Sequence, residues 1–272
     1  MSFFVLIRGG GDIASGVALR LYRAGIKVLI SELAQPLAVR RLVSFAEAVY
    51  NGETQVEGIT ARRITDPSDT LKILRVFSQG QLPVLIDPEA TCVASLHPAV
   101  VIDGRMSKRP SDTNRYAVSL VIGLGPGFVA GENCHVVVET NRGIAMGRVI
   151  WQGAPEADTG IPEAVQERRE ERVLRAPQDG LLETHVEIGD RLYKDQLIAR
   201  VGGQEVLAPF QGILRGLLHP GMQVSKGLKI GDLDPRLEPR MCRLVSDKSL
   251  AVGGGVLEAI LSRPNFRSIL WT

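Results

Sequence analysis

The beginning of the chain limits its fold more than any other part. Residues 3–7 are apolar, glycines follow at positions 9–11, and residues 12–25 are compatible with a helix. Gly9 and Gly11 let the backbone turn sharply, so that amides at the start of the helix can face an anion with no side chain in between. This order of strand, glycine turn and helix predicts an α/β sheet whose first loop faces a phosphate group.

The glycine turn matches the dinucleotide-binding pattern, in which the first and third positions are Gly and the sixth is Gly or Ala. Gly9, Gly11 and Ala14 occupy these positions. A second apolar run, residues 27–30, is followed by Glu32, about where such units carry an acidic residue for a ribose hydroxyl. We therefore expect this region to bind a nucleotide. The expected contacts are Gly9, Gly10, Gly11, Asp12, Ile13 and Glu32.

Two carboxylates leave the identity of the ligand open. Asp12, in the first helical turn, suits the helix dipole but repels a nearby pyrophosphate, so a hydroxyl or Mg²⁺ is an alternative partner. Glu32 favours NAD over NADP because a carboxylate repels a 2′-phosphate, although Arg40 and Arg41 blur that preference. A glycine turn with no ligand, and a solvated strand end at Glu32, are the other interpretations.

Alternation of short apolar runs with helix-compatible stretches continues to about residue 151. The runs at 3–7, 27–30, 83–86, 100–102, 118–122 and 136–139 predict strands, and residues 37–50 and 68–79 carry apolar residues at helical spacing. The expected fold class is α/β, with a Rossmann-like, mostly parallel sheet and helices on both of its faces.

Chemically capable residues follow one of these strands, at the edge where open α/β sheets bind ligands. After residues 100–102, Asp103 offers a carboxylate for hydroxyls or a metal, while Arg105 and Lys108 offer cations for a phosphate. A solvated turn is the alternative interpretation of this loop.

Glycines follow the next strand. Gly123, Gly125 and Gly127 can form a nest of backbone amides for an anion, and a mobile linker is the alternative. After residues 136–139, Asn141 and Arg142 precede a turn, where an exposed hairpin competes with a ligand-binding role.

Charge and hydropathy exclude several classes of function. The net charge of only +2 over 272 residues gives no basic field for DNA, RNA or an anionic membrane. No segment has the roughly eighteen uninterrupted apolar residues of a membrane span, and the first apolar run is too short for a signal peptide. The expected location is the cytoplasm.

Cysteines and histidines form no recognisable site in the sequence. Three widely separated cysteines argue against a disulfide framework and a zinc knuckle, and are most simply small core residues. The histidines have no metal-ligand spacing, so we predict no metal site and assign no catalytic residue. The residues concerned are Cys92, Cys134, Cys242, His97, His135, His185 and His219.

An internal repeat with an offset of 32 residues follows a polar stretch. Ala176, Pro177 and Gly180 recur as residues 208, 209 and 212, and Gly189 recurs as residue 221. Two such halves of short strands and glycine turns predict a β-sandwich with pseudo-twofold symmetry. The repeat resembles the biotinyl/lipoyl barrel-sandwich, but the hairpin at residues 201–206 has no lysine at its tip, so no covalent biotin or lipoate is expected.

These observations predict a division into four parts. Residues 1–153 form the nucleotide-binding domain, 154–172 a connector and 173–237 the β-sandwich. Residues 238–272 contain three glycines at 253–255 that open an apolar helix, expected to pack on the first domain, and Ser246 suits its N-cap.

The whole chain resembles the YqeB family of accessory proteins for selenium-dependent molybdenum hydroxylases. The segments GGGDIASGVALRLYRAG, LVIGLGPGFVAGENCHVVVETNRG and LKIGDLDPR carry the resemblance. It implies a Rossmann-type domain like that of xanthine dehydrogenase accessory factors and a role in maturing the hydroxylase's molybdenum site. The family pattern also leads us to expect a histidine where this chain has Ile144, so a proton-transfer role at that position is lost.

The expected function is therefore that of a maturation factor binding a nucleotide-bearing ligand, either NAD(P) or a molybdopterin dinucleotide, with a molybdenum hydroxylase as client. Two alternatives remain. The chain can be an NAD(P)-dependent oxidoreductase acting on a selenium or sulfur species, or a non-catalytic scaffold that docks the client. The sequence leaves homo-oligomerisation and any contact with selenium open.

Overall fold

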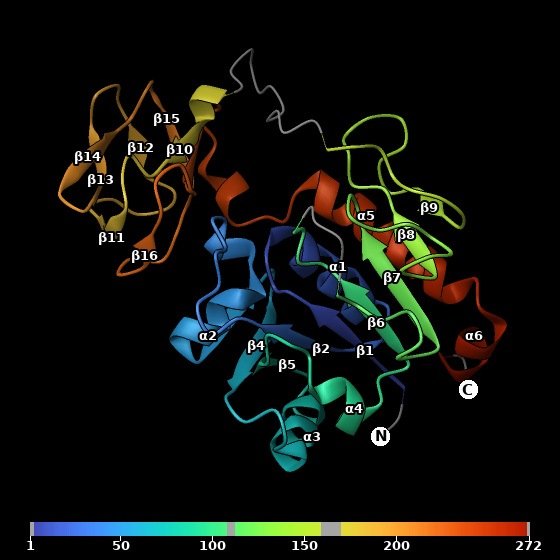
Figure 1. The fold of residues 1–272 in the computed structure, drawn as a ribbon. Coiled ribbons are helices and arrows are strands. Elements are labelled where there is room, and N and C mark those ends of the chain that lie inside the picture. The colour runs from blue at the N-terminus through green and yellow to red at the C-terminus, as the bar shows by residue number, and fades with distance from the viewer. Residues whose placement is uncertain (1–2, 108–111, 159–169, 271–272) are drawn as a thin grey trace. The chain divides into compact units, whose positions relative to one another are not determined.

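The computed structural model describes residues 3–107, 112–158 and 170–270. The chain divides into two units, and each is described by itself (Figure 1). Unit 1 comprises Met1–Pro36, Ser44–Asp158 and Val245–Thr272, and unit 2 comprises Leu37–Val43 and Thr159–Leu244. Unit 2 thus takes a short segment from within the first 50 residues, which the expected domain boundaries did not include.

Unit 1 is built on a sheet of nine strands in the order β3-β4-β5-β2-β1-β6-β7-β8-β9. The strands from β4 to β8 in this order are parallel to their neighbours, and β3 and β9 are antiparallel edges. The strands are β1 Phe4–Arg8, β2 Lys27–Glu32, β3 Glu53–Val56, β4 Ile59–Ile64, β5 Leu82–Ile86, β6 Val100–Asp103, β7 Leu120–Leu124, β8 Val136–Val138 and β9 Val149–Ile150.

The prediction of a mixed α/β fold with a large, mostly parallel sheet is confirmed. All six predicted runs form strands of this sheet, because each is buried on both faces and therefore reads as a continuous apolar run. The prediction missed β3, β4 and β9. Two of these lie at the edges of the sheet, and β4 mixes buried and half-buried residues.

Helices cover both faces of the sheet (Figure 1). One core includes Phe4 and Leu6 of β1 together with Ile73 of α3 and Leu96 of α4. Helices α1 and α5 contact each other, and α5 also contacts β7, β8 and β9. The helices are α1 Asp12–Arg23, α2 Ala48–Asn51, α3 Thr70–Ser78, α4 Cys92–Leu96, α5 Asp247–Leu261 and α6 Pro264–Leu270, and the 3₁₀ turn η2 is Phe45–Glu47.

Helix α5 corrects one expectation about the C-terminal segment. Its three glycines, residues 253–255, lie inside the helix rather than before it. A side chain at Gly253 would stand 2.8 Å from the side chain of Arg20 in α1. A side chain at Gly255 would overlap the backbone of Gly147. These two glycines are therefore needed for close packing. Ser246 caps α5 as predicted, since its hydroxyl accepts from the Ser249 amide.

The predicted helix at residues 37–50 was wrong. This stretch contains the 3₁₀ turns η1 Arg41–Val43 and η2, and only Ala48–Asn51 is α-helical. Apolar residues at helical spacing are buried here, but in two different units, because Leu37–Val43 belongs to unit 2. The predicted helix at 68–79 is confirmed as α3, which begins after the cap Asp69.

Unit 2 contains two four-stranded antiparallel sheets, ordered β10-β17-β15-β12 and β14-β13-β11-β16. The strands are β10 Val173–Arg175, β11 Gly180–Thr184, β12 Arg191–Leu192, β13 Leu197–Val201, β14 Gln204–Leu207, β15 Gly212–Leu217, β16 Gln223–Val224 and β17 Lys229–Asp234. The 3₁₀ turns are η3 Glu170–Arg172 and η4 Pro239–Cys242.

The 32-residue repeat is visible in these strands. Strands β11, β12 and β13 begin at residues 180, 191 and 197, and β15, β16 and β17 begin 32 residues later, at 212, 223 and 229. Exchanging the two halves converts the strand order of one sheet into that of the other. Each sheet therefore combines strands from both halves of the repeat.

Leu37–Val43 joins unit 2 through backbone contacts. The Leu217 amide donates to the Val39 carbonyl at 2.9 Å, and a Cβ at Gly216 would stand 2.8 Å from the Val39 side chain. Arg40 donates to two backbone carbonyls of the same unit, those of Met241 and Leu244. Arg40, which blurred the choice between NAD and NADP in the sequence, is thus engaged within unit 2.

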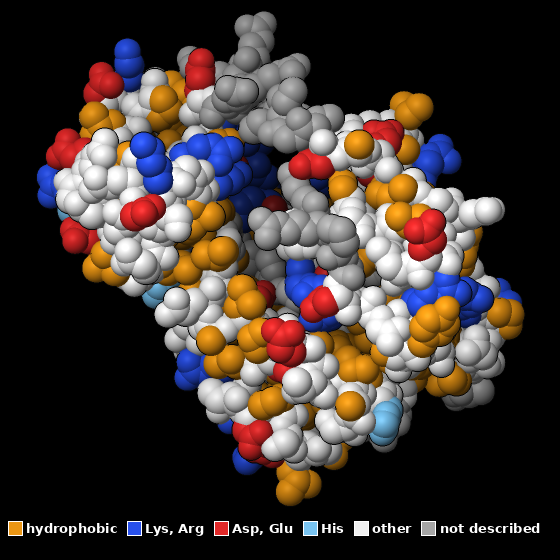
Figure 2. Space-filling model, viewed as in Figure 1, with side chains coloured by type: hydrophobic (Ala, Val, Ile, Leu, Met, Phe, Trp, Pro, Cys, Tyr) orange, Lys and Arg blue, Asp and Glu red, His pale blue; other side chains and the backbone are white. Residues whose placement is uncertain are grey.

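The described surface has a mixed character. On the face shown in Figure 2, charged side chains of both signs are interspersed with apolar ones. Within the described ranges, none of the helices is long and apolar enough to cross a bilayer.

Candidate functional site

The centre of the sheet in unit 1 has the topology of a ligand-binding edge. β1 has β2 on one side and β6 on the other, and both are parallel to it. The chain therefore changes direction across the sheet at β1, and the loops that follow β1 and β6 leave the same edge. Ligands of open α/β sheets bind at such a switch point.

The loop after β1 is held rigidly at its first two glycines. Gly9 has a φ of +91°, which favours glycine, and its amide donates to the Ser31 carbonyl at 2.7 Å. The Gly10 carbonyl accepts from the Ala46 amide and from the Ser15 hydroxyl, both at 2.9 Å. A Cβ at Gly10 would stand 2.8 Å from the Ala46 nitrogen. Glycine at position 10 is thus required by close backbone packing.

Gly11 differs from its two neighbours. A Cβ built there meets nothing within 4 Å, and the backbone is extended with a φ of −70°. Gly11 is also the N-cap of α1, and as a glycine it supplies no side-chain acceptor for the amides of the first turn. Among the described residues, the space in front of Gly11 is therefore open, and it lies at the positive end of a 12-residue helix.

Glu32, at the end of β2, contacts this loop directly. Its Oε2 accepts from the Gly10 amide at 2.6 Å, and its Oε1 accepts from the Leu33 amide at 2.7 Å. Burial raises the pKa of the Glu32 carboxyl, and the two amides oppose that effect. Glu32, which the sequence predicted to bind a ribose, thus also helps to fix the glycine turn.

Asp12 and Ile13 begin α1, and Asp12 is tied to α5. The Ser249 hydroxyl donates to Asp12 Oδ1 at 3.0 Å, and a side chain at Gly16 would overlap Ser249. Ile13 is half-buried. The Asp12 carboxylate, for which the sequence suggested a hydroxyl or Mg²⁺ as partner, thus has a structural role in contacting α5.

Charged side chains that follow β6 pair with one another. Asp103 is only 2 % exposed, and its carboxylate accepts from Arg105 at 2.6 Å and from the Thr113 hydroxyl at 2.5 Å. Arg105 also pairs with Asp112. Hydrogen bonds from Arg105, together with those from Arg8, hold the pKa of the Asp112 carboxyl well below its usual range. Asp103 and Arg105, expected to meet a ligand, are brought together and neutralise each other.

Arg8 is a member of this cluster that sequence reasoning missed. It is the last residue of β1, is 5 % exposed, and donates to Asp112 at 2.9 Å and to Thr113 at 2.8 Å. A charged residue at the end of an apolar strand was the available signal, but its side-chain partners Asp112 and Thr113 lie more than 100 residues away. Lys108, predicted with Arg105, lies outside the described residues.

Neighbouring side chains fill the space beside the glycines at the end of β7 and in the loop after it. A Cβ at Gly123 would overlap the Phe128 ring, and one at Gly125 would overlap the Thr140 side chain. The Gly125 amide donates to the Val138 carbonyl at 3.0 Å, so it does not point at an external anion. Gly127 has a φ of +103°, as a tight turn requires. Packing explains these glycines without a ligand.

The connection from β8 to β9 is a hairpin with an exposed tip. Glu139 is buried, and its carboxylate accepts from the Asn141 amide at 2.6 Å and the Glu156 amide at 2.7 Å. Arg142 pairs with Asp247 of α5, and Ile144 is 96 % exposed. The interpretation of this segment as an exposed hairpin fits these positions.

The cysteines are buried thiols. Burial raises the pKa of Cys134 to about 11 and also raises the pKa values of Cys92 and Cys242, so all three stay protonated at neutral pH. Within residues 3–107, 112–158 and 170–270, no group of three or more His, Cys, Asp or Glu side chains is arranged to hold a metal ion.

Comparisons with known proteins found a clear relative in sequence but only weak likeness in structure. No protein-family profile matches the chain. The chain is similar to an aspartoacylase family protein of Mesorhizobium loti, with a TM-score of 0.27 and 10% identity over 87% of this chain and 86% of that one. For the ectoine utilization protein EutE of Ruegeria pomeroyi the TM-score is 0.24, with 11% identity over 85% and 86%. Likeness this low indicates no activity.

One curated protein is related to the chain in sequence. The uncharacterized protein YqeB of Escherichia coli (strain K12) is 45% identical over 257 residues, which cover 94% of this chain and 47% of YqeB. The chain therefore spans about half the length of the curated relative that it matches. On this sequence identity, we identify the chain as a homologue of about half of YqeB.

Proposed function

We propose that the loop from Gly9 to Asp12 binds the phosphate of a nucleotide-bearing ligand. The observation that carries the proposal is the open space in front of Gly11, at the N-terminus of α1 and at the switch point of the sheet. Backbone amides at a helix N-terminus attract phosphate through their partial positive charge. Because Gly9 and Gly10 are fixed by packing, the loop is organised before the ligand arrives, which lowers the entropic cost of binding.

Glu32 is the residue best placed for the sugar of such a ligand. Its carboxylate touches the glycine loop at Gly10, so a hydroxyl next to the bound phosphate lies within its reach. NAD(P) and a molybdopterin dinucleotide both combine a phosphate with a ribose, and both fit this pair of groups. NAD(P) would supply a hydride acceptor or donor. Asp103 and Arg105 form an ion pair with each other. We therefore expect the described residues of this edge to bind and orient NAD(P) rather than to react with it.

The cellular role that we propose is maturation of a selenium-dependent molybdenum hydroxylase in the cytoplasm. This role rests on the family resemblance of the sequence. A nucleotide site whose described residues include no recognisable acid and base suits a factor that holds or delivers a cofactor. Hydride transfer to a selenium or sulfur species is the enzymatic alternative, and it requires the same site.

Unit 2 is proposed as a lipoyl-like module without a covalent cofactor. Its repeated strands and its interleaved sheets support this assignment. The β13–β14 hairpin turns at Gly202 and Gly203, with φ values of +56° and +89°, and presents no lysine. Such a module suits docking of the client better than carrying a swinging arm.

Calorimetric titration of the whole protein with NAD, NADP and CTP, with Mg²⁺ present, tests the nucleotide site. Gly11→Val fills the open space, whereas Gly254→Val is a matched control because Gly254 also has nothing within 4 Å. We expect binding in the micromolar range, about −8 kcal/mol, that Gly11→Val removes and the control retains. Equal affinity in the Gly11→Val protein would contradict the proposal. Binding of no nucleotide would favour the scaffold alternative.

A further inference from the structure

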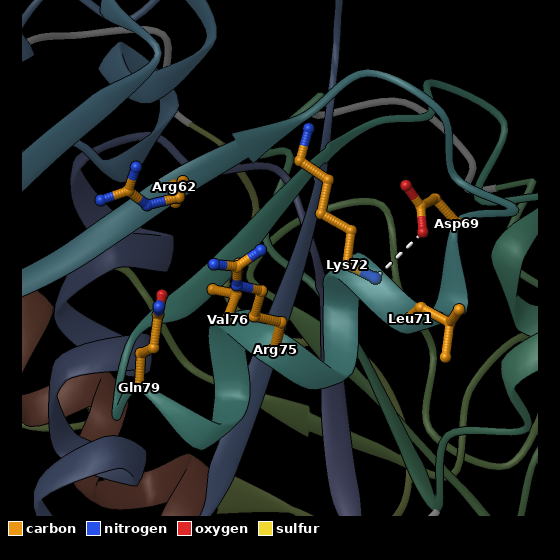
Figure 3. Close-up of a pocket in the computed structure, with 7 residues that line it drawn as sticks. All are labelled: Arg62, Asp69, Leu71, Lys72, Arg75, Val76 and Gln79. Carbon is orange, nitrogen blue, oxygen red and sulfur yellow. Dashed lines mark hydrogen bonds between the residues drawn. The ribbon is translucent and has the colours of Figure 1, made fainter.

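A surface hollow of unit 1 lies between β4 and α3, and neither element takes part in the glycine loop. Its volume is about 530 Å³, and its lining includes Arg62 of β4, Lys72 and Arg75 of α3, and Gln79, the C-cap of α3 (Figure 3). Cavities of this size accommodate small organic molecules.

The helical residues share one face of α3. Arg75 follows Lys72 by three residues and Gln79 follows it by seven, so the three side chains lie one above another along the helix. In Figure 3 they extend from α3 on the side where Arg62 lies. Ile73 and Val76 are buried and anchor α3 to the sheet, and Val76 also borders the hollow. The basic face is thus carried by a packed helix.

The cations of the hollow are incompletely neutralised. Arg62 is positioned at one edge, where it donates to Gln81 at 3.1 Å and pairs with Glu53 at 2.7 Å. In the described part of the chain, the side chains of Lys72 and Arg75 have no hydrogen bond or ion pair. Positive charge therefore exceeds negative charge in the lining.

The one carboxylate in the lining serves the helix. Asp69 caps α3, and its Oδ1 accepts from the Lys72 amide at 2.9 Å. The carboxylate is thereby directed to the Lys72 amide in the first turn. Apolar surface from Val76 and Leu71 completes the wall beside the cations.

We propose that this hollow binds a small phosphorylated organic molecule. Two guanidinium groups and one ammonium suit a phosphate dianion, since arginine can bind phosphate oxygens in pairs and lysine adds a point charge. The Gln79 amide adds a neutral donor, and the exposed side chain of Leu71 offers contact to a carbon skeleton. Charge attracts the phosphate, and the apolar wall distinguishes an organic phosphate from the free ion.

Titration of the whole protein tests the proposal, with ribose 5-phosphate, inorganic phosphate and uncharged ribose as probes. Calorimetry gives the affinity, and ¹⁵N NMR of the arginine Nε–H groups reports which side chains respond. We expect saturable binding of ribose 5-phosphate with a Kd of about 1 mM or lower, weaker binding of inorganic phosphate and none of ribose. Phosphate and ribose 5-phosphate binding equally would overturn the assignment to an organic phosphate.

Variants locate the binding. Arg75→Gln and Lys72→Gln remove exposed cations and should each weaken binding about tenfold. Lys194→Gln, an exposed charge in unit 2, is the matched control and should bind like the wild type. Gly11→Val should also bind like the wild type, which separates this hollow from the glycine loop. Loss of affinity in neither Arg75→Gln nor Lys72→Gln, or the absence of saturation at about 10 mM ligand, would overturn the proposal.

Discussion

Two glycine-rich loops of the same sheet have opposite characters. In the loop after β1, the position of Gly11 leaves open space at the start of a helix, whereas at the end of β7 and in the loop after it the positions of Gly123 and Gly125 are filled by Phe128 and Thr140. The sequence presents both as candidate anion sites. The difference lies in what occupies the direction of the missing Cβ, which depends on side chains that are several residues away. The number of glycines therefore does not identify a binding loop. What lies in the direction of each missing Cβ must also be known.

The largest expected effect tests the filled loop. Gly123→Ala should lower the free energy of unfolding by about 3 kcal/mol, because the added methyl group overlaps the Phe128 ring. Urea denaturation measures it. Gly123→Ala combined with Phe128→Leu should lose less than the sum of the two single variants. Strict additivity would show that the ring does not cause the cost, and Gly254→Ala is the control.

The loop after β6 is expected to depend on its buried carboxylate. Asp103→Asn should cost about 2 kcal/mol of stability, because Arg105 then loses the charge that compensates it in a buried site. Asp112→Asn should cost less, since the Asp112 side chain is 55% exposed. Thermal and urea unfolding of both variants compare them. A larger loss from Asp112→Asn would reverse our view of which carboxylate closes the loop.

Glu32 should give the open loop a characteristic pH dependence. Because its pKa is raised above 4.5 in the folded protein, the folded state holds the proton more tightly than the unfolded state. The stability of the wild type relative to Glu32→Gln should therefore fall as the pH rises from 4.5 through the folded-state pKa, by at most about 1.4 kcal/mol per pH unit.

Nucleotide affinity should change in the other direction over the same pH range. A hydroxyl of the ligand donates to the carboxylate, so binding should strengthen as Glu32 loses its proton. Carboxyl ¹³C NMR gives the pKa, and titrations at several pH values give the affinity. Parallel changes in stability and affinity would argue against a contact between Glu32 and the ligand.

The smallest expected effect on stability comes from the open loop. Gly11→Ala should change the free energy of unfolding by less than about 0.5 kcal/mol, because the backbone at Gly11 is extended and the new methyl group meets no atom. The same variant should weaken nucleotide binding. A stability loss as large as that of Gly123→Ala would remove the distinction between the two loops.

The sheet of unit 1 could be predicted because its strands are locally encoded. Buried parallel strands read as apolar runs, and the glycine turn after β1 identifies the first of them. The repeat in unit 2 was equally visible as an offset of 32 residues. These features need no knowledge of distant partners.

What could not be predicted depends on contacts between distant residues. Val39 pairs with Leu217 across 178 positions, so the assignment of residues 37–43 to unit 2 leaves no local signal. Arg8 meets Asp112 and Thr113 in the same way. The glycines of α5 read as a helix start because their role, close contact with α1 and Gly147, comes from elsewhere in the chain.

The position of α5 at residues 247–261 has a consequence for synthesis of the protein. α1 and the strands β7 and β8, which α5 contacts, are complete by residue 138, so the ribosome must add more than 100 residues before their cover exists. At about 5–20 residues per second that interval lasts on the order of 10 s. During this time the nascent chain exposes an apolar surface that the finished protein buries, and a chaperone on the ribosome would protect that surface until α5 is made.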